Sequence, residues 1–96
     1  MTPSRPVHTD TRERVIRAEV GRGMALPDGL RAALERASGA DLGDVRLHDD
    51  ELADGLAASL HADAFTAGAD VFFRAGALRP HSDDGVELLA HEVAHV

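Results

Sequence analysis

Helix signals and metal-ligand spacing coincide in one stretch of this 96-residue chain, Ser82-Asp83-Asp84-Gly85-Val86-Glu87-Leu88-Leu89-Ala90-His91-Glu92-Val93-Ala94-His95-Val96. Ser82 is a suitable N-cap, and the acidic residues that follow it suit the positive end of a helix dipole. Leucine and valine then recur at helical spacing. The stretch is therefore expected to form an amphipathic helix that starts near residues 82–84 and carries the pattern His-Glu-x-x-His.

The two histidines of this pattern are four residues apart, which places them on one face of a helix. His91 and His95 can then direct two ring nitrogens at one zinc ion, at about 2.0–2.1 Å. Glu92 is displaced around the helix and can reach a metal-bound water without binding the metal. Zinc lowers the pKa of such a water toward about 7, and Glu92 can take its proton while the hydroxide attacks a peptide carbonyl. The pattern predicts a zinc-dependent peptidase site; the alternative is a helix with two surface histidines near its end.

Composition narrows the chemistry further. The chain has no cysteine, so any metal must be held by histidine or carboxylate side chains. A net charge of -7, with 17 acidic and 10 basic residues, argues against a nucleic-acid partner, which requires a basic face. No stretch approaches the roughly 20 apolar residues of a membrane span, so no membrane partner is expected. Residues 1–10 lack a signal peptide, so we expect a cytoplasmic protein whose export would use a route that reads no standard signal.

The rest of the chain reads as short helices and strands of one small domain. Residues 1–13 contain two prolines and several charges, and we expect them to form a flexible lead-in to a domain over residues 14–96. The fold class is α+β, with helices, a short strand, an edge β-hairpin and the C-terminal His-Glu-x-x-His helix. Helices are expected at residues 11–20, 28–38 and from about 50 onward, strands at 44–48, 63–67 and 70–74, and a tight turn at 68–69.

Single residues carry further expectations. Asp49 and Asp50 are expected to cap the helix that follows them, and this helix should bury a stripe of Leu52, Leu56 and Leu60 with the neighbouring alanines. The aromatic residues should anchor the core: Phe65, Phe72 and Phe73.

The upstream histidines are weaker candidates for the metal. His48 ends a short strand and either approaches the metal as a third ligand or is a hydrogen-bonded structural histidine. His61 and His81 are expected on the surface, at a helix end and in a loop.

Several segments together resemble one bacterial family. They are Leu26-Pro27, Leu30-Arg31, Glu35, Gly39-Ala40-Asp41-Leu42, Asp44-Val45-Arg46-Leu47-His48-Asp49, Ala64-Phe65-Thr66-Ala67-Gly68, Asp70-Val71-Phe72-Phe73 and Leu88-Leu89-Ala90-His91-Glu92-Val93-Ala94-His95-Val96. This set is similar to the extracellular contractile injection system (eCIS) core domain family, a zincin-like family of proposed zinc metallopeptidases. The resemblance covers roughly residues 14–96, and the last segment is its most specific part.

The resemblance implies a compact α+β domain that is often attached to toxin or effector segments and encoded beside phage-tail-like injection machines. It implies a protein or peptide substrate, and it includes His48 in the family pattern, which favours this residue over the other upstream histidines. It also implies an injection-system particle as a partner. A non-catalytic adaptor that marks cargo for such a particle is therefore an alternative to the peptidase.

Family members usually continue the last helix with further apolar and glutamine residues, and zincins commonly take their third ligand from beyond it. Here Val96 alone follows the motif. We therefore expect an incomplete domain with weak or absent peptidase activity. The adaptor and an inactive remnant remain the open alternatives.

Overall fold

The computed structural model describes the backbone of residues 7–96 and the side chains of residues 12–96. Within these residues the chain forms four helices and one four-stranded sheet, in agreement with the expected α+β class. None of these helices has the length and apolar character needed to cross a membrane. The elements in chain order are α1 (Val7–Glu19), β1 (Met24–Ala25), α2 (Asp28–Ser38), β2 (Arg46–His48), α3 (Glu51–Ser59), β3 (Ala64–Ala67), β4 (Asp70–Phe73) and α4 (Asp83–Val93).

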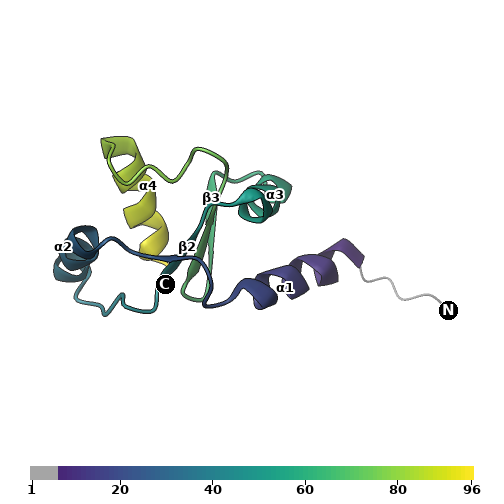
Figure 1. Cartoon of the computed structure of the whole chain (residues 1–96), viewed down its shortest axis with the longest axis horizontal. Helices are drawn as coiled ribbons and strands as arrows, with labels where there is room; N and C mark the ends of the chain where they lie inside the picture. The colour runs from purple at the N-terminus through teal and green to yellow at the C-terminus, as the bar shows by residue number, and fades with distance from the viewer. Residues whose placement is uncertain (1–6) are drawn as a thin grey trace.

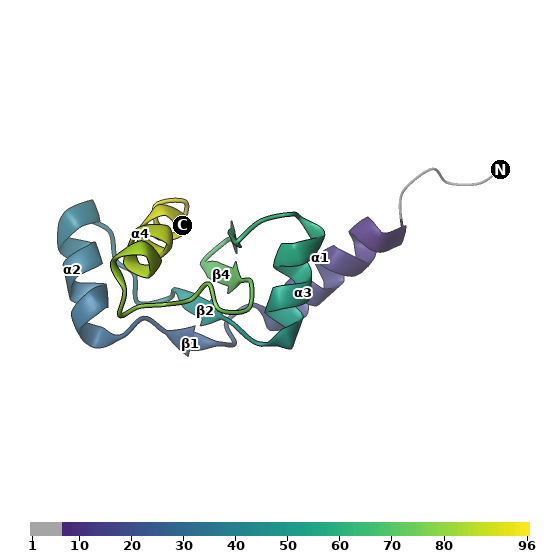
Figure 2. The same cartoon turned by 90° about the horizontal axis from the view of Figure 1, so that it is seen from above.

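The sheet has the strand order β1-β2-β4-β3. Its two central strands, β2 and β4, are parallel, and each edge strand is antiparallel to its neighbour. Parallel strands require a crossover connection, which α3 and β3 provide between β2 and β4. Helices α2 and α4 lie on one side of the sheet, and α3 and α1 lie on the other (Figure 1, Figure 2). The domain therefore has three layers, with the sheet in the middle.

Two apolar clusters join these layers. Successive residues of a strand point to opposite faces of its sheet, so Phe73 packs toward α4 while Phe72 packs toward α3. The larger cluster comprises Leu26, Leu42, Val45, Leu47, Ala64, Val71, Phe73, Leu89 and Val93. The smaller cluster comprises Ala53, Leu56 and Phe72, with Val15, Ile16, Phe65 and Ala67 packed against it.

Local signals set the helix ends. The side chains of Asp50 and Ser82 accept the backbone N–H groups of Ala53 and Gly85, at 2.9 and 3.0 Å, and so cap α3 and α4. Gly39 ends α2 in the left-handed conformation, with φ of 74°. The expected caps Asp50 and Ser82 and the expected glycine stop of α2 are thus confirmed, whereas Asp49, also expected as a cap, precedes the N-cap position of α3.

The first helix differs from the expectation. Helix α1 begins at Val7, so residues 7–13, which we expected in the flexible lead-in, are helical; residues 1–6 of that lead-in lie outside the described residues. No proline lies between Pro6 and the end of α1 at Glu19, so no proline in residues 7–13 prevents a helix from propagating. Val15 and Ile16 anchor this helix on the smaller cluster.

Two further features differ from the expectation. Strand β1 was not predicted, because two residues are too few to show an alternating pattern. Leu52 in α3 and Leu60, the residue that follows α3, are 42% and 40% exposed, whereas Leu56, Ala53 and Ala57 are buried as expected. The predicted leucine stripe is therefore wrong at two of its three positions, because small alanine side chains let the helix lie close to the bulky Phe72.

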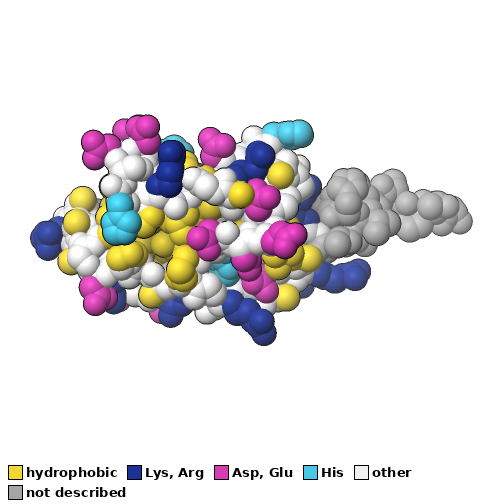
Figure 3. All heavy atoms as spheres, turned by 45° about the horizontal axis from the view of Figure 1, so that its top comes forward, with side chains coloured by type: hydrophobic (Ala, Val, Ile, Leu, Met, Phe, Trp, Pro, Cys, Tyr) yellow, Lys and Arg dark blue, Asp and Glu magenta, His cyan; other side chains and the backbone are white. Residues whose placement is uncertain are grey.

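The surface mixes both signs of charge. On the face shown in Figure 3, arginine side chains lie scattered among acidic ones, and hydrophobic side chains gather near its centre. The described arginines therefore do not form a continuous basic patch on this face.

Candidate metal centre

The residues of the His-Glu-x-x-His motif at the end of α4 lie in two environments, one exposed to solvent and one sheltered by the sheet. Leu89 and Val93 are four residues apart and both are buried against the sheet. His91 follows Leu89 by two positions, which turns it toward the opposite side of the helix. The helix was expected to carry the whole motif, but α4 ends at Val93, so His95 lies in the turn that follows it; both histidines are exposed. Glu92 lies on the flank of the buried stripe and is 8% exposed. The register of the core thus presents two histidines to solvent with a sheltered carboxylate between them.

The two histidine rings lie together. Their centroids are 5.1 Å apart, and the ring planes are inclined by 74°. An ion about 2.0–2.1 Å from a ring nitrogen lies about 3 Å from the centre of that ring, so rings at this spacing can share one ion. Imidazole nitrogen is a preferred ligand of zinc. The ring spacing therefore permits the two histidines to be candidate ligands of one zinc ion.

The candidate base contacts the edge strand β3. The Thr66 hydroxyl lies 2.8 Å from Oε1 of Glu92 and 3.0 Å from the main-chain carbonyl oxygen of the same residue. That carbonyl also accepts the N–H of His95 at 3.0 Å. One strand residue therefore touches both the candidate base and the turn that carries a candidate ligand.

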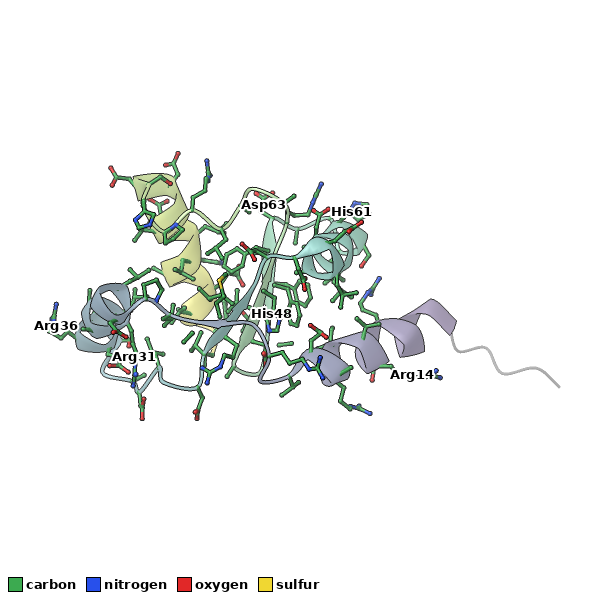
Figure 4. All side chains as sticks on the ribbon, viewed as in Figure 1. Arg14, Arg31, Arg36, His48, His61 and Asp63 are labelled. Carbon is green, nitrogen blue, oxygen red and sulfur yellow. The ribbon has the colours of Figure 1, made fainter. Side chains whose placement is uncertain are left out.

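His48 lies in a different part of the molecule. Its ring stacks on Phe72 with a centroid distance of 4.3 Å, on the face of the sheet covered by α3 and α1, and Figure 4 shows it in the interior. Its Nε2 is 2.7 Å from Oδ1 of Asp70, which also accepts the N–H of Gly21 at 3.1 Å. This histidine is buried in a hydrogen-bonded network, as the structural alternative predicts.

The structure brings some candidate residues together and separates others. Because α4 covers the other face of the sheet, His48 is not beside His91 and His95. Within the described part of the chain, no three His, Asp or Glu side chains lie close enough to hold one ion. The structure therefore assembles two candidate ligands and one candidate base.

The remaining polar candidates have ordinary positions. His61 and His81 are exposed, as expected, and His61 follows α3 with a positive φ of 55°. Figure 4 shows His61 at the end of α3. Asp50 caps α3, and Asp49 is exposed.

Sequence reasoning did not single out Thr66 or Asp70. Both are polar residues inside short strands, on positions that alternation turns toward a packed face. Thr66 shares its face with buried Ala64, and Asp70 shares its face with buried Phe72. A polar side chain at a buried strand position requires a hydrogen-bond partner. The sequence therefore indicated that Thr66 and Asp70 would each have such a partner, although it could not name the partner.

Comparison with known proteins identifies one family. The sequence model of the eCIS core domain matches residues 25–96, which includes β2, β3, β4, the second residue of β1 and the whole of α4. No curated protein and no solved structure matched the chain.

Proposed function

The chain belongs to the eCIS core domain family, and we propose that its last helix carries a zinc-dependent peptidase site within this contractile-injection-associated domain. His91 and His95 would hold the ion, and Glu92 would act as the general base. The observation that supports this proposal is the arrangement on α4, where the two rings are 5.1 Å apart and the carboxylate lies between them and β3. This is the arrangement that the His-Glu-x-x-His pattern predicts.

The protein side of the chemistry follows from the hydrogen bonds. Bound zinc would lower the pKa of a water molecule to about 7 and polarise a substrate carbonyl. Glu92 would accept the proton from the attacking water. Its Oε1 is engaged by Thr66, and no hydrogen bond among the described residues engages Oε2, which leaves that oxygen to receive the proton. Shelter from solvent strengthens the interaction between this carboxylate and a nearby charge.

The experiment begins with zinc. We expect the purified chain to bind about one zinc ion in calorimetry, and the variant with both His91→Ala and His95→Ala to bind none. The matched control replaces two exposed histidines outside the motif, His61 and His81, with alanine, and this variant should bind zinc as the unchanged chain does. Equal zinc uptake by both double variants would refute the ligand assignment.

Hydrolysis is tested on the zinc-loaded chain with an unfolded protein as substrate. Glu92→Gln keeps the size of the side chain but cannot accept a proton, so it should bind zinc normally and lose cleavage. Cleavage that persists in Glu92→Gln would exclude Glu92 as the base.

The family name also supports a partner, because it associates the domain with extracellular contractile injection systems. We propose that the chain binds an injection-system particle, in the manner of a cargo adaptor, whether or not it cleaves peptides. Co-sedimentation with purified particles from the source organism tests this binding. If the chain is an adaptor without peptidase function, the His91→Ala/His95→Ala variant should co-sediment with the particles as well as the unchanged chain does. Absence of the chain from repeated particle preparations would contradict the partnership.

A further inference from the structure

The contact between Thr66 and Glu92 joins two elements that are distant in sequence. Thr66 lies in β3, an edge strand of the sheet, and 26 positions separate it from Glu92. Alternation along β3 places Phe65 and Ala67 toward α3 and α1, and Thr66 toward α4. The hydroxyl is therefore held by the sheet, and it meets the last turn of α4.

Two unfavourable features of Glu92 explain why a donor is needed there. Its carboxylate is buried, and a buried charge is costly unless it is paired or hydrogen-bonded. It also lies in the last turn of α4, where the helix dipole is negative and the final carbonyls lack partners within the helix. No ion pair of the described residues includes Glu92. Among the described residues, the Thr66 hydroxyl supplies the hydrogen bond to this side chain.

One hydroxyl proton faces two acceptors of the same residue. Thr66 Oγ1 is within hydrogen-bond distance of both the carboxylate and the main-chain carbonyl of Glu92. A proton donated to the carboxylate restricts the side chain to one rotamer, and a proton donated to the carbonyl secures the turn that includes His95. Either way, the position of the motif relative to β3 depends on this hydroxyl.

We propose that Thr66 is a positioning residue, which holds the Glu92 carboxylate in one rotamer and fastens the last turn of α4 to β3. Its consequence for catalysis rests on the proposed function: the carboxylate would be held ready to accept a proton, with His95 kept beside His91. The hydrogen-bonding role itself does not depend on zinc or on peptide cleavage.

The decisive measurement is the rotamer of Glu92 in the full chain without zinc. Thr66→Val keeps the shape of the side chain and removes the hydroxyl, so NMR scalar couplings of Glu92 should change from single-rotamer to averaged values. The His95 amide should exchange its hydrogen about fivefold faster, the change expected for the loss of one hydrogen bond. Thr66→Ser retains the hydroxyl and should behave as the unchanged chain does. Ser59→Ala is the matched control, because it removes a hydroxyl that donates to a carbonyl in α3, that of Leu56.

A second arm tests the consequence for hydrolysis. In the zinc-loaded chain, Thr66→Val should lower kcat on the order of tenfold, with KM and the Kd for zinc unchanged, and Thr66→Ser should restore kcat. If Thr66→Val does not fold, Thr66→Ala is compared with Thr66→Ser, since both lack the methyl group and differ only in the hydroxyl.

The two arms separate this proposal from the proposed function. Unchanged Glu92 couplings in Thr66→Val would overturn the positioning role, whatever the chain does with zinc. Failure of the unchanged chain to bind zinc would refute the proposed function, and the couplings would still decide the role of Thr66.

Discussion

Replacing Asp70 with alanine should destabilise the domain more than any exposed acidic substitution. Asp70 is 3% exposed, and its Oδ1 accepts two hydrogen bonds, from the His48 ring at 2.7 Å and from the Gly21 N–H at 3.1 Å. Removal of the carboxylate leaves the buried ring nitrogen without its partner, whereas Gly21 is exposed and its N–H can bond water. The larger part of the loss therefore comes from His48.

The magnitude follows from these two donors. A buried polar group left without a partner costs about 1–3 kcal/mol, and a hydrogen bond replaced by water costs about 1 kcal/mol or less. Together they give about 1–4 kcal/mol. The whole domain is expected to have a free energy of unfolding of about 5–14 kcal/mol, at about 0.05–0.15 kcal/mol per residue. One substitution should therefore remove a large part of the stability.

Urea unfolding followed by circular dichroism measures this loss. With a urea dependence of about 1–1.5 kcal/mol per molar, typical of a small domain, the midpoint should fall by roughly 0.7–4 M. Asp44→Ala is the matched control, because it removes the same charge from an exposed position in the same region, and its midpoint should barely change. Equal midpoints for the two variants would refute the role assigned to Asp70.

A double variant sharpens the test. His48→Phe combined with Asp70→Ala removes the donor and the acceptor together, and the new ring can continue the stack of His48, Phe72 and Phe65. Replacement of both partners by apolar groups can be nearly neutral, so this variant should be more stable than Asp70→Ala alone. If it is less stable, the penalty does not come from the unpaired histidine.

Two further predictions concern the helices that frame the core. The pKa of Glu35 lies below its ordinary value of 4.5, chiefly because its carboxylate accepts the N–H of Leu42 at 2.7 Å and also because Arg31 donates to it at 3.0 Å. The charged form therefore stabilises the fold above the ordinary pKa, and this stabilisation is lost as pH falls through the lower folded-state value. Glu35→Gln should accordingly lower the Tm near neutral pH, and the difference from the unchanged chain should vanish in acid; a difference that persists in acid would contradict this assignment. Gly85→Ala should destabilise the domain by about 2 kcal/mol or more, because a Cβ there would overlap the main-chain carbonyl of Arg79. Thermal unfolding of Gly55→Ala, an α3 glycine with open space around it, is the control, and equal Tm values for the two variants would count against the steric reason.

The ends of most elements could be predicted from short stretches of sequence. The bounds of α2 and the N-caps of α3 and α4 agree with expectation, and the hairpin turns at Gly68 with the positive φ of 63° that glycine allows. These features depend on contacts between residues within a few positions of one another. The same locality brings His91 and His95 together, since the end of α4 and the turn that follows it place the two rings side by side.

Tertiary structure decided the environment of the functional candidates. Alternation in residues 44–48 indicated that His48 faces away from Leu47, but it could not show that this second face is also buried, beneath α3 and α1. Zinc binding and peptide hydrolysis are both proposals, which the neighbouring rings of His91 and His95 and the sheltered carboxylate of Glu92 support.

The sequence by itself determined most of the helices and strands, apart from β1 and the start of α1, and it determined the spacing of the motif, because helix and turn preferences act over one or two turns of chain. The strand order, the partner of His48 and the partner of Glu92 required the folded domain. Their contacts join residues separated by 22 positions for His48 and Asp70, 26 for Thr66 and Glu92, and 49 for Gly21 and Asp70. No local pattern specifies such pairs, because they form only when the parallel pairing of β2 with β4 gives the sheet two covered faces, with α4 on one of them and α3 with α1 on the other.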